Sequence, residues 1–299
     1  MFSTDQYELL DFGAFHGVGR KLERFSEYVI SRPSPPADRA KPKRPELWSQ
    51  ANDEFLLTGK KENDKGRWKQ RNPLSSTWQI NNEYFSLNLR PTPFGHLGVF
   101  AEQQKNWDWI YRQTKKSGRP IKVLNLFAYT GGSSLAAAAA GAEVVHIDSA
   151  KNVVSWAREN AELSGFQDKP IRWIVEDCSL FVKRELKRRK QYDAIILDPP
   201  SFGHGPKNEI WKIEKDLIGL LRDCKNLLSD RPEYFLLSCH SPGLGAAELH
   251  ATVCDAVFGT CSVQVQAADM NLKTSDGRQL NSGHCVRWSA SRPVIEPLS

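Results

Sequence analysis

Short apolar runs alternate with segments of helical periodicity from about residue 100 onward, and this alternation limits the possible folds more than any other feature. Strands that alternate with helices at this spacing are typical of a parallel, doubly wound α/β sheet. The last two strands have little sequence between them, so we expect an antiparallel edge. The sequence therefore predicts a Rossmann-like, mostly parallel sheet of seven strands. Strands are expected at 121–127, 143–148, 171–175, 192–197, 234–239, 262–267 and 284–288, and helices at 102–116, 133–140, 151–163, 180–190, 209–228 and 246–258.

The N-terminal part of the chain has a different character. Short aromatic-rich runs bounded by Gly, Pro and Asn are typical of short β-strands. Residues 31–45 contain five prolines and five Lys or Arg, which predicts a stiff, extended surface segment. We therefore expect a β-rich, basic region at 1–95, serving as a substrate-docking element or a lid, and an α/β domain at 96–299. The short strands are expected at 7–10, 27–30, 77–80 and 85–89.

The formal net charge of +6 is concentrated in the first part of the chain. Residues 1–120 contain 20 Lys and Arg against 14 Asp and Glu, whereas residues 121–299 contain 21 of each kind. A local basic excess favours an anionic partner such as nucleic acid. A solvated surface with no such partner has the same composition, so charge alone leaves both interpretations open.

Several classes of protein are disfavoured by the composition. No run of 18 or more apolar residues occurs, so we expect no transmembrane helix. The first residues, Met1–Asp5, lack the basic and apolar parts of a secretory signal. The six cysteines include no Cys-x-x-Cys pair, which predicts neither a zinc site nor a disulfide framework. A protein of the reducing cytoplasm fits these features best.

Ligands of doubly wound sheets bind outside the carboxyl ends of the strands, so the residues that follow each strand are the candidates for a site. The first expected strand leads into Asn125–Gly132, which ends in two glycines. Paired glycines let a backbone approach a ligand closely, although they also make ordinary turns. The loop is neither Gly-x-Gly-x-x-Gly nor followed by Gly-Lys-Ser/Thr, which disfavours a dinucleotide or P-loop site.

Two carboxylates follow the next two strands. Asp148 lies 17 residues beyond Gly131 and could accept both hydroxyls of a ribose, because a carboxylate has two acceptor oxygens. Asp177 is suited to an adenine amino group. Each of them could instead be the N-cap of the helix that follows.

The fourth and fifth strands are followed by residues suited to chemistry. Asp198-Pro199-Pro200 forms a rigid turn that holds carbonyls and a carboxylate toward a cleft, and Phe202 could stack on a planar base. Cys239, after the fifth strand, is either a nucleophile or a core thiol, and position alone slightly favours the core thiol. His240 is a neighbouring base or a turn residue.

Together these motifs resemble those of class I S-adenosylmethionine-dependent methyltransferases. The Phe127–Gly132 loop and the Asp198–Phe202 turn resemble, more narrowly, bacterial large-subunit ribosomal-RNA methyltransferases of the cytosine-C5 type. The resemblance extends over about residues 95–290. It departs from that family in residues 1–95, which match no RNA-binding domain, and at Asn125, where an acidic residue is usual.

This resemblance implies a cofactor, S-adenosylmethionine, and residues that hold it. The first loop would cradle the methionine part, Asp148 the ribose and Asp177 the adenine. Ser238-Cys239 stands where cytosine-C5 members carry their nucleophile, which favours a catalytic Cys239. The implied cofactor-binding residues are Asn125, Phe127, Tyr129, Thr130, Gly131, Gly132, Asp148, Asp177 and Asp198, and the implied catalytic residues are Cys239, Asp198, Pro199 and Phe202.

Two chemistries are compatible with these residues, and the resemblance favours the first, methylation of cytosine C5 in ribosomal RNA. In the first, the Cys239 thiolate adds to cytosine C6, Asp198 binds the ring near N3, and the methyl group is transferred to C5. In the second, Asp198 and the Pro199 carbonyl accept hydrogen bonds from an amino group whose nitrogen is methylated, while Phe202 stacks on the base. A protein side chain or a small metabolite is a third possible substrate.

An RNA substrate, ribosomal RNA above all, is the favoured partner. Basic residues would contact its phosphates, and two tryptophans, Trp48 and Trp68, could stack on unpaired bases. A solvated helix face is the alternative for the basic run at 183–190. The candidate contacts are Lys183, Arg184, Lys187, Arg188, Arg189 and Lys190, and the basic loops at 39–45 and 60–71.

Overall fold

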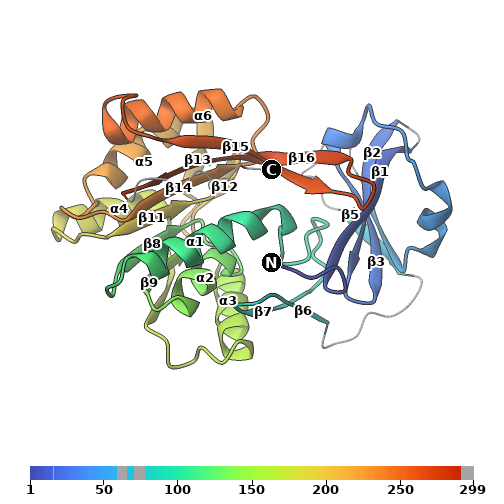
Figure 1. Ribbon diagram of the computed structural model, residues 1–299, viewed down its shortest axis with the longest axis horizontal. Helices are drawn as coiled ribbons and strands as arrows, with labels where there is room; N and C mark the ends of the chain where they lie inside the picture. Colours follow the sequence, from blue (N-terminus) through green and yellow to red (C-terminus); the bar gives the residue numbers. More distant parts are fainter. Residues whose placement is uncertain (16, 59–65, 71–77, 291–299) are drawn as a thin grey trace. The chain divides into compact units, whose positions relative to one another are not determined.

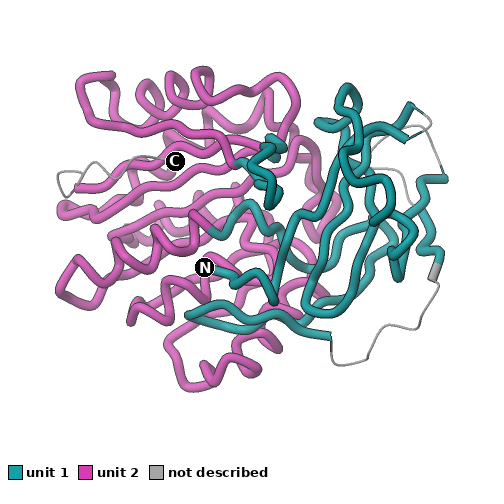
Figure 2. Tube along the Cα trace, turned by 45° about the vertical axis from the view of Figure 1, so that its right-hand side comes forward, with its two compact units in different colours: residues 1–104, 271–282 teal, residues 105–270, 283–299 magenta. Residues whose placement is uncertain are grey.

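The computed structural model of the chain divides into two compact units, coloured separately in Figure 2. The first unit comprises residues 1–104 and 271–282, and the second unit comprises residues 105–270 and 283–299. The sequence pattern places a division at residue 95 and gives no sign that residues 271–282 return to the first unit. The residues that the structure describes are 1–15, 17–58, 66–70 and 78–290.

The second unit is built on a seven-stranded sheet with the order β10-β9-β8-β11-β14-β16-β15 (Figure 1). The strands from β10 to β14 in this order are parallel, β16 runs antiparallel to β14, and β15 forms the edge. The predicted doubly wound, mostly parallel sheet with an antiparallel edge strand is confirmed. Its strands are β8 (Lys122–Leu126), β9 (Glu143–Asp148), β10 (Ile171–Val175), β11 (Ala194–Leu197), β14 (Tyr234–Cys239), β15 (Gln266–Lys273) and β16 (Gln279–Ser289).

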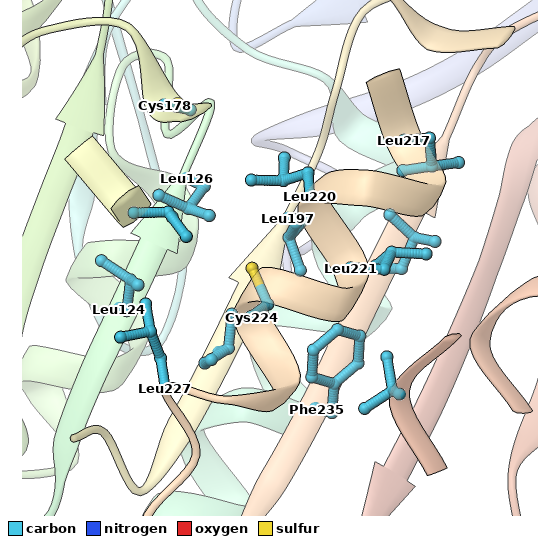
Figure 3. Packing of buried hydrophobic residues seen from close by; sticks show 14 of the residues in the cluster. Leu124, Leu126, Cys178, Leu197, Leu217, Leu220, Leu221, Cys224, Leu227 and Phe235 are labelled. Atoms are coloured by element: carbon cyan, nitrogen blue, oxygen red, sulfur yellow. The ribbon is translucent and has the colours of Figure 1, made fainter. Parts of the chain in front are cut away.

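Helices cover both faces of this sheet. On one face, side chains of α4, α5 and α6 share a single apolar cluster with β8, β9, β11 and β14, and Figure 3 shows part of it. On the other face, Thr114 of α1 bonds Tyr234 at 3.0 Å and Ser134 of α2 bonds Asn125 at 2.9 Å. No helix in the described part of the chain is long and apolar enough to cross a membrane. The helices are α1 (Gln104–Lys116), α2 (Gly132–Ala139), α3 (Lys151–Leu163), α4 (Cys178–Lys187), α5 (Ile213–Lys225) and α6 (Ala246–Val253).

The expected helix at 209–228 is wrong at its start. Residues 202–212 form a hairpin of β12 (Phe202–His204) and β13 (Ile210–Lys212), and α5 begins at Ile213. Trp211 explains the strand, because its indole N–H donates to the Pro200 carbonyl at 2.7 Å. Three other predictions shift in position: α4 begins at Cys178 rather than Leu180, the helix at 246–258 changes to a wider π turn after residue 253, and the last strands lie at 266–273 and 279–289.

The first unit contains the predicted β-rich region. Its main sheet has the order β1-β2-β3-β4-β5, antiparallel except for the β3–β4 pair, and a separate hairpin joins β6 to β7. Leu9 and Phe12 of β1 pack with Leu272 and Leu280, so residues 271–282 complete the core of this unit. Its strands are β1 (Tyr7–Phe15), β2 (Val18–Phe25), β3 (Tyr28–Pro33), β4 (Asp53–Leu57), β5 (Gly66–Gln70), β6 (Gln79–Asn81) and β7 (Ser86–Asn88).

Strand β2 is absent from the sequence prediction because charged residues hide its apolar pattern. Glu23 of this strand is fully buried. The Arg32 guanidinium reaches its Oε2 at 2.5 Å, and the Tyr7 hydroxyl donates to its Oε1 at 3.0 Å. Burial opposes ionisation of Glu23, but the charges of Arg32 and Lys21 outweigh that effect and hold its pKa below the ordinary value. A paired internal charge therefore replaces an apolar side chain in this strand.

The proline-rich segment 31–45 has many exposed residues, as predicted, but it is folded into turns and partly packed instead of extended throughout. It forms a 3-10 turn at Pro35–Ala37, whose last residue is fully buried, and a second such turn begins at Pro45. The backbone N–H groups of Lys43 and Arg44 donate to the buried Asp11 carboxylate. The prolines fix local backbone angles, whereas contacts with β1 hold the segment in place.

Candidate active site

The carboxyl ends of β8, β9, β10, β11 and β14 meet at one edge of the second unit's sheet, because these strands are parallel neighbours. The loop after β8 is strained. Phe127 and Tyr129 adopt positive φ values of 55° and 50°, which non-glycine residues rarely do, and Gly131 follows with 96°. Such strain collects at functional sites, where the surrounding structure enforces it.

Hydrogen bonds from three directions hold this loop. The Phe127 N–H donates to Sγ of Cys178 at 3.3 Å, and the Tyr129 N–H donates to Oδ2 of Asp148 at 2.9 Å. The Asn160 amide of α3 donates to the Thr130 carbonyl at 2.9 Å. The loop is therefore a rigid element fixed to β9, α3 and α4.

The two glycines of the loop are required by packing inside the protein. A Cβ on Gly131 would lie 3.2 Å from the Ala157 methyl group, and a Cβ on Gly132 would lie 2.6 Å from ring atoms of Trp107. Close approach to helices α3 and α1 thus accounts for both residues. The interpretation of Gly131-Gly132 as an ordinary structural turn explains them without a ligand.

Asp148 stands at the end of β9 with a half-buried carboxylate. Burial raises its pKa above the ordinary value, while backbone N–H groups of Ala150, Tyr129 and Ser149 oppose that shift. The carboxylate accepts from Tyr129 at Oδ2 and from Ala150 at Oδ1, at 2.9 and 3.0 Å. Each oxygen keeps further acceptor capacity for a ligand hydroxyl.

Asp177 and Asn125 both have structural partners. Oδ1 of Asp177 accepts from the Leu180 N–H at 2.9 Å, so this carboxylate is the N-cap of α4. Asn125 is 1% exposed, and its amide donates to Ser134. The Asn125 side chain therefore lies inside the fold and not at the open edge, which removes the reason to assign it a direct contact with a cofactor.

Asp198 is held at the end of β11 by residues of β14 and the loop after it. The Ser238 hydroxyl donates to Oδ1 of Asp198 at 2.8 Å. Nε2 of His240 lies 3.6 Å from the same oxygen. The Asp198 side chain is 29% exposed, so a fixed carboxylate faces both the protein and solvent.

The turn that follows Asp198 is equally well fixed. Pro199 is buried and Pro200 is exposed. The Pro200 carbonyl accepts from Trp211, whose ring lies 4.9 Å from that of Phe127 between centroids. This contact joins the hairpin to the loop after β8 and leaves Phe202 half exposed at 50%.

Cys239 is fully buried within the apolar cluster of the second unit. Burial raises the pKa of its thiol, and the Ser241 N–H, which donates to Sγ at 3.4 Å, only partly opposes the shift. A neutral, enclosed thiol is a poor nucleophile. The geometry therefore corresponds to a core thiol, the other role that the sequence leaves open for this residue.

The basic run at 183–190 ends far from the strand ends. Helix α4 begins after β10 at the site edge and runs back toward the edge where β11 begins, so Lys187–Lys190 lie at the opposite edge of the sheet. Within the run, Arg184 pairs with Glu176, and Arg188 pairs with Glu185 at 3.1 Å. This geometry corresponds to a solvated helix face, with Lys187–Lys190 away from the site and Arg184 reaching Glu176 at the site edge.

The two tryptophans predicted to stack on bases have partners inside the first unit. Trp48 donates to Asp11 at 2.9 Å and lies 4.1 Å from Phe15 between ring centroids. Trp68 donates to the Thr92 carbonyl at 2.8 Å. Of the basic loop at 60–71, residues 60, 61, 65 and 71 lie outside the described residues, and Arg67 and Lys69 stand on β5.

Several residues of the site escape sequence reasoning. In the sequence analysis, Ser238 enters only as the neighbour of Cys239, and Trp211 lies within an expected helix. His146, on β9, bonds Ser134 at 3.0 Å beneath the strained loop, and burial lowers its pKa to about 3, so the ring is neutral. A polar residue in the middle of an apolar strand is the signal that marks His146.

The arrangement fits S-adenosylmethionine, the cofactor implied by the resemblance. A strained loop follows β8, and a half-buried carboxylate with spare acceptor capacity ends β9. These are suitable partners for the amino-acid part and the ribose of that molecule.

Comparison with known proteins gives the same family. Residues 45–257 match the model of a family described as S-adenosylmethionine-dependent methyltransferases. A crystal structure of an S-adenosylmethionine-dependent methyltransferase from Agrobacterium tumefaciens is 34% identical, with a TM-score of 0.87 over 97% of this chain and 93% of its own. A Streptococcus mutans structure shares the fold alone, at 18% identity and a TM-score of 0.73 over 94% of this chain and 74% of its own.

Among curated proteins, a Shewanella baltica protein named ribosomal RNA large subunit methyltransferase K/L is 33% identical over 159 residues. A protein of the same name from Pseudoalteromonas atlantica is 33% identical over 150 residues. The matches cover 52% and 50% of this chain but only 21% and 20% of those relatives. Because the family model covers well over half of its length, this chain belongs to the S-adenosylmethionine-dependent methyltransferases, enzymes that take their methyl group from S-adenosylmethionine.

Proposed function

We propose that this enzyme methylates a nitrogen atom of a base in RNA, with large-subunit ribosomal RNA as the favoured substrate. The observation that carries this proposal is the Asp198 carboxylate, which is held by Ser238 and followed in the chain by the half-exposed Phe202. A carboxylate at this place can accept a hydrogen bond from an amino group and keep electron density on its nitrogen. An exposed aromatic ring can stack on the base that carries that group.

Different residues of the chain bind the cofactor and the base. Bound S-adenosylmethionine supplies a methyl group that its sulfonium already activates. Asp148 holds the ribose, and the loop from Phe127 to Gly132 holds the methionine part. Asp177 holds the adenine through Oδ2, while its Oδ1 caps α4. Asp198 and the Pro199 carbonyl orient the amino group, and Phe202 fixes the plane of the base. The base must leave its stack to reach this edge.

RNA is supported by two independent observations. The curated relatives carry the name of a ribosomal RNA methyltransferase. The excess of positive charge lies in residues 1–120, where residues 1–104 of the first unit carry 15 Lys and Arg against 13 Asp and Glu, and residues 105–120 of the second unit carry five against one. We assign docking of the RNA backbone to basic residues within 1–120, where phosphate contacts would give affinity and a steep dependence on salt.

The experiment that tests this function is transfer of labelled methyl groups into unmodified large-subunit ribosomal RNA made by transcription in vitro. The RNA is then digested to nucleosides. Label in an N-methylated nucleoside supports the proposal. Label in 5-methylcytidine would show that the methylated atom is a carbon and not a nitrogen. Label found only in protein or metabolites of a cell extract would show that RNA is not the substrate.

Cys239→Ala separates the two chemistries. We expect kcat to stay within about twofold of the wild type, because a buried neutral thiol takes no part in methylation of a nitrogen. Addition of this thiol to cytosine C6 requires an accessible thiolate, so that mechanism predicts complete loss of turnover. Turnover is measured with the RNA above, and binding of S-adenosylmethionine by calorimetry shows that the variant remains folded.

Asp148→Asn tests the cofactor site. We expect the Kd for S-adenosylmethionine to rise about 10- to 100-fold, the effect of losing charge-assisted hydrogen bonds worth about 1.5–3 kcal/mol. Because burial raises the pKa of Asp148, wild-type affinity should weaken as the pH falls, beginning above the range where ordinary aspartates titrate. The variant should lack this pH dependence. Glu143→Gln, at the other end of β9, is the control, and equal weakening in both variants would contradict the assignment.

A further inference from the structure

The proposed methylation leaves a proton to be removed, and the site contains a side chain suited to accept it. An amino nitrogen that gains a methyl group becomes positively charged and returns to neutrality by losing a proton. Asp198 binds the amino group in the proposed function. The imidazole of His240 lies beside that carboxylate, with Nε2 3.6 Å from Oδ1 of Asp198, and histidine is the side chain that most often accepts a proton in catalysis.

The structure holds the imidazole of His240 in one orientation. Nε2 faces Asp198, and the Nδ1 edge packs toward Gly283 of β16. A Cβ on Gly283 would come within 2.9 Å of Nδ1 and 2.7 Å of the Cys239 carbonyl, so only glycine leaves room for the ring. The His240 side chain is 32% exposed, which leaves it open to solvent and to a substrate at the strand ends.

Titratable groups face this imidazole from neighbouring strands. Asp198 faces it from β11, and Cys239 precedes it in the chain. From β15 and β16 come Asp269 and His284, which bond each other at 2.8 Å. Asp198 is the carboxylate that lies 3.6 Å from the Nε2 atom.

We propose that His240, with Asp198, is the proton-accepting pair of the reaction. The nitrogen lone pair forms the new N–C bond, and the electron pair of the broken S–C bond stays on sulfur. One N–H bond then breaks, its electron pair returns to nitrogen, and the proton binds Nε2 of His240. The resulting imidazolium is stabilised by the Asp198 carboxylate beside it and releases its proton to solvent.

This inference rests on the proposed function and is tested by pH profiles of His240→Gln and His240→Ala with the transcribed ribosomal RNA. We expect kcat at pH 7 to fall about 10- to 100-fold in both variants, with unchanged affinity for S-adenosylmethionine and an unchanged product. We expect the wild-type kcat to fall at acidic pH, and this fall should be absent from both variants. Added imidazole should restore part of the activity of His240→Ala, and His250→Gln, on α6, serves as the control.

Failure of this inference is distinguishable from failure of the proposed function. A wild-type enzyme that produces no N-methylated nucleoside overturns the function before any variant is made. If the wild-type enzyme does produce one, and the variants keep both its kcat and its loss of rate at acidic pH, only the role of His240 is overturned. Loss of activity without rescue by imidazole, and with an unchanged acidic limb, likewise assigns His240 a structural role.

Discussion

Replacing Asp198 with alanine is expected to lower kcat for RNA methylation by about a hundredfold to a thousandfold, the effect of losing a preorganised group at a reacting centre. The carboxylate is fixed before substrate arrives, because the Ser238 hydroxyl donates to it at 2.8 Å and His240 stands at 3.6 Å. In the alanine variant that hydroxyl loses its acceptor on Asp198 and keeps the 3.4 Å contact with the Leu197 carbonyl. Both the acceptor for the amino group and the partner of the imidazole are lost.

Asp198→Asn is the more informative variant of the two. The amide keeps one acceptor oxygen but loses the negative charge, so we expect a smaller loss of kcat, about tenfold. If His240 accepts the proton, the asparagine variant should also weaken the acidic limb of the pH profile, because the charge that stabilises the imidazolium is gone. Comparison of the two variants thus separates hydrogen bonding from charge.

The measurements are kcat with transcribed ribosomal RNA and Kd for S-adenosylmethionine by calorimetry. Asp198 is partly exposed, so the variants should fold. Asp168→Ala, an exposed carboxylate before β10, is the matched control. A rise in Kd as large as the fall in kcat would instead place Asp198 in the cofactor site, and full activity of Asp198→Ala would remove it from the mechanism.

The sheet and the ends of its strands could be predicted because parallel strands buried on both faces appear in the sequence as continuous apolar runs. β9 is a clear case, since its predicted bounds, 143–148, are those of the structure. Asp148 follows from them, as the polar residue that ends the run. Local pattern is sufficient wherever a residue's role depends on the strand that contains it.

Residues whose role depends on neighbouring strands could not be predicted in the same way. Ser238 and His240 contact Asp198 only because β14 lies beside β11, and no local pattern states that order. Burial of Cys239 depends on β16, which pairs with β14 there. The resemblance to cytosine-C5 enzymes supplied a role for this cysteine, whereas packing in the apolar cluster of the second unit determines its exposure.

The first unit shows the opposite limitation of sequence patterns. Strand β2 contains Arg20, Glu23 and Arg24, charges that usually mark a surface. Glu23 is nevertheless fully buried, because Arg32 of the adjacent strand neutralises it. A pattern of alternating polarity cannot identify a buried ion pair, since each charged residue, considered without its partner, is expected to be exposed.

A second buried carboxylate makes the largest stability prediction for this unit. Asp11 is fully buried, and its oxygens accept from Phe12 N–H, Arg44 N–H and the Trp48 indole, each at 2.9 Å. It also pairs with Arg278, which lies in the segment that returns at 271–282. One side chain therefore ties β1, the proline-rich segment and the returning segment together.

Asp11→Ala is expected to lower the stability of the first unit by about 3–5 kcal/mol, since it leaves a guanidinium and several N–H groups without their buried acceptor. Hydrogen exchange of β1 and β2 amides in the full-length chain measures this as faster local opening. Glu46→Ala removes an exposed carboxylate from the same region and should leave the exchange unchanged. Equal exchange rates in the wild type and Asp11→Ala would show that the contacts of Asp11 add nothing to the stability of the first unit.

The stability that Asp11 gives to the first unit should depend on pH in a definite direction. Burial opposes ionisation of Asp11, but the donors from Trp48, Arg44 and Arg278 hold its pKa below the ordinary value of 3.8. A carboxyl group with a lowered pKa stabilises the folded state above its unfolded pKa and loses that contribution as the pH falls through its folded pKa. Asp11→Asn should therefore destabilise the first unit at pH 7, and the difference from the wild type should shrink once the pH falls below about 4. A difference that stays constant down to that pH would mean that the shape of the side chain, and not its charge, holds the three segments together.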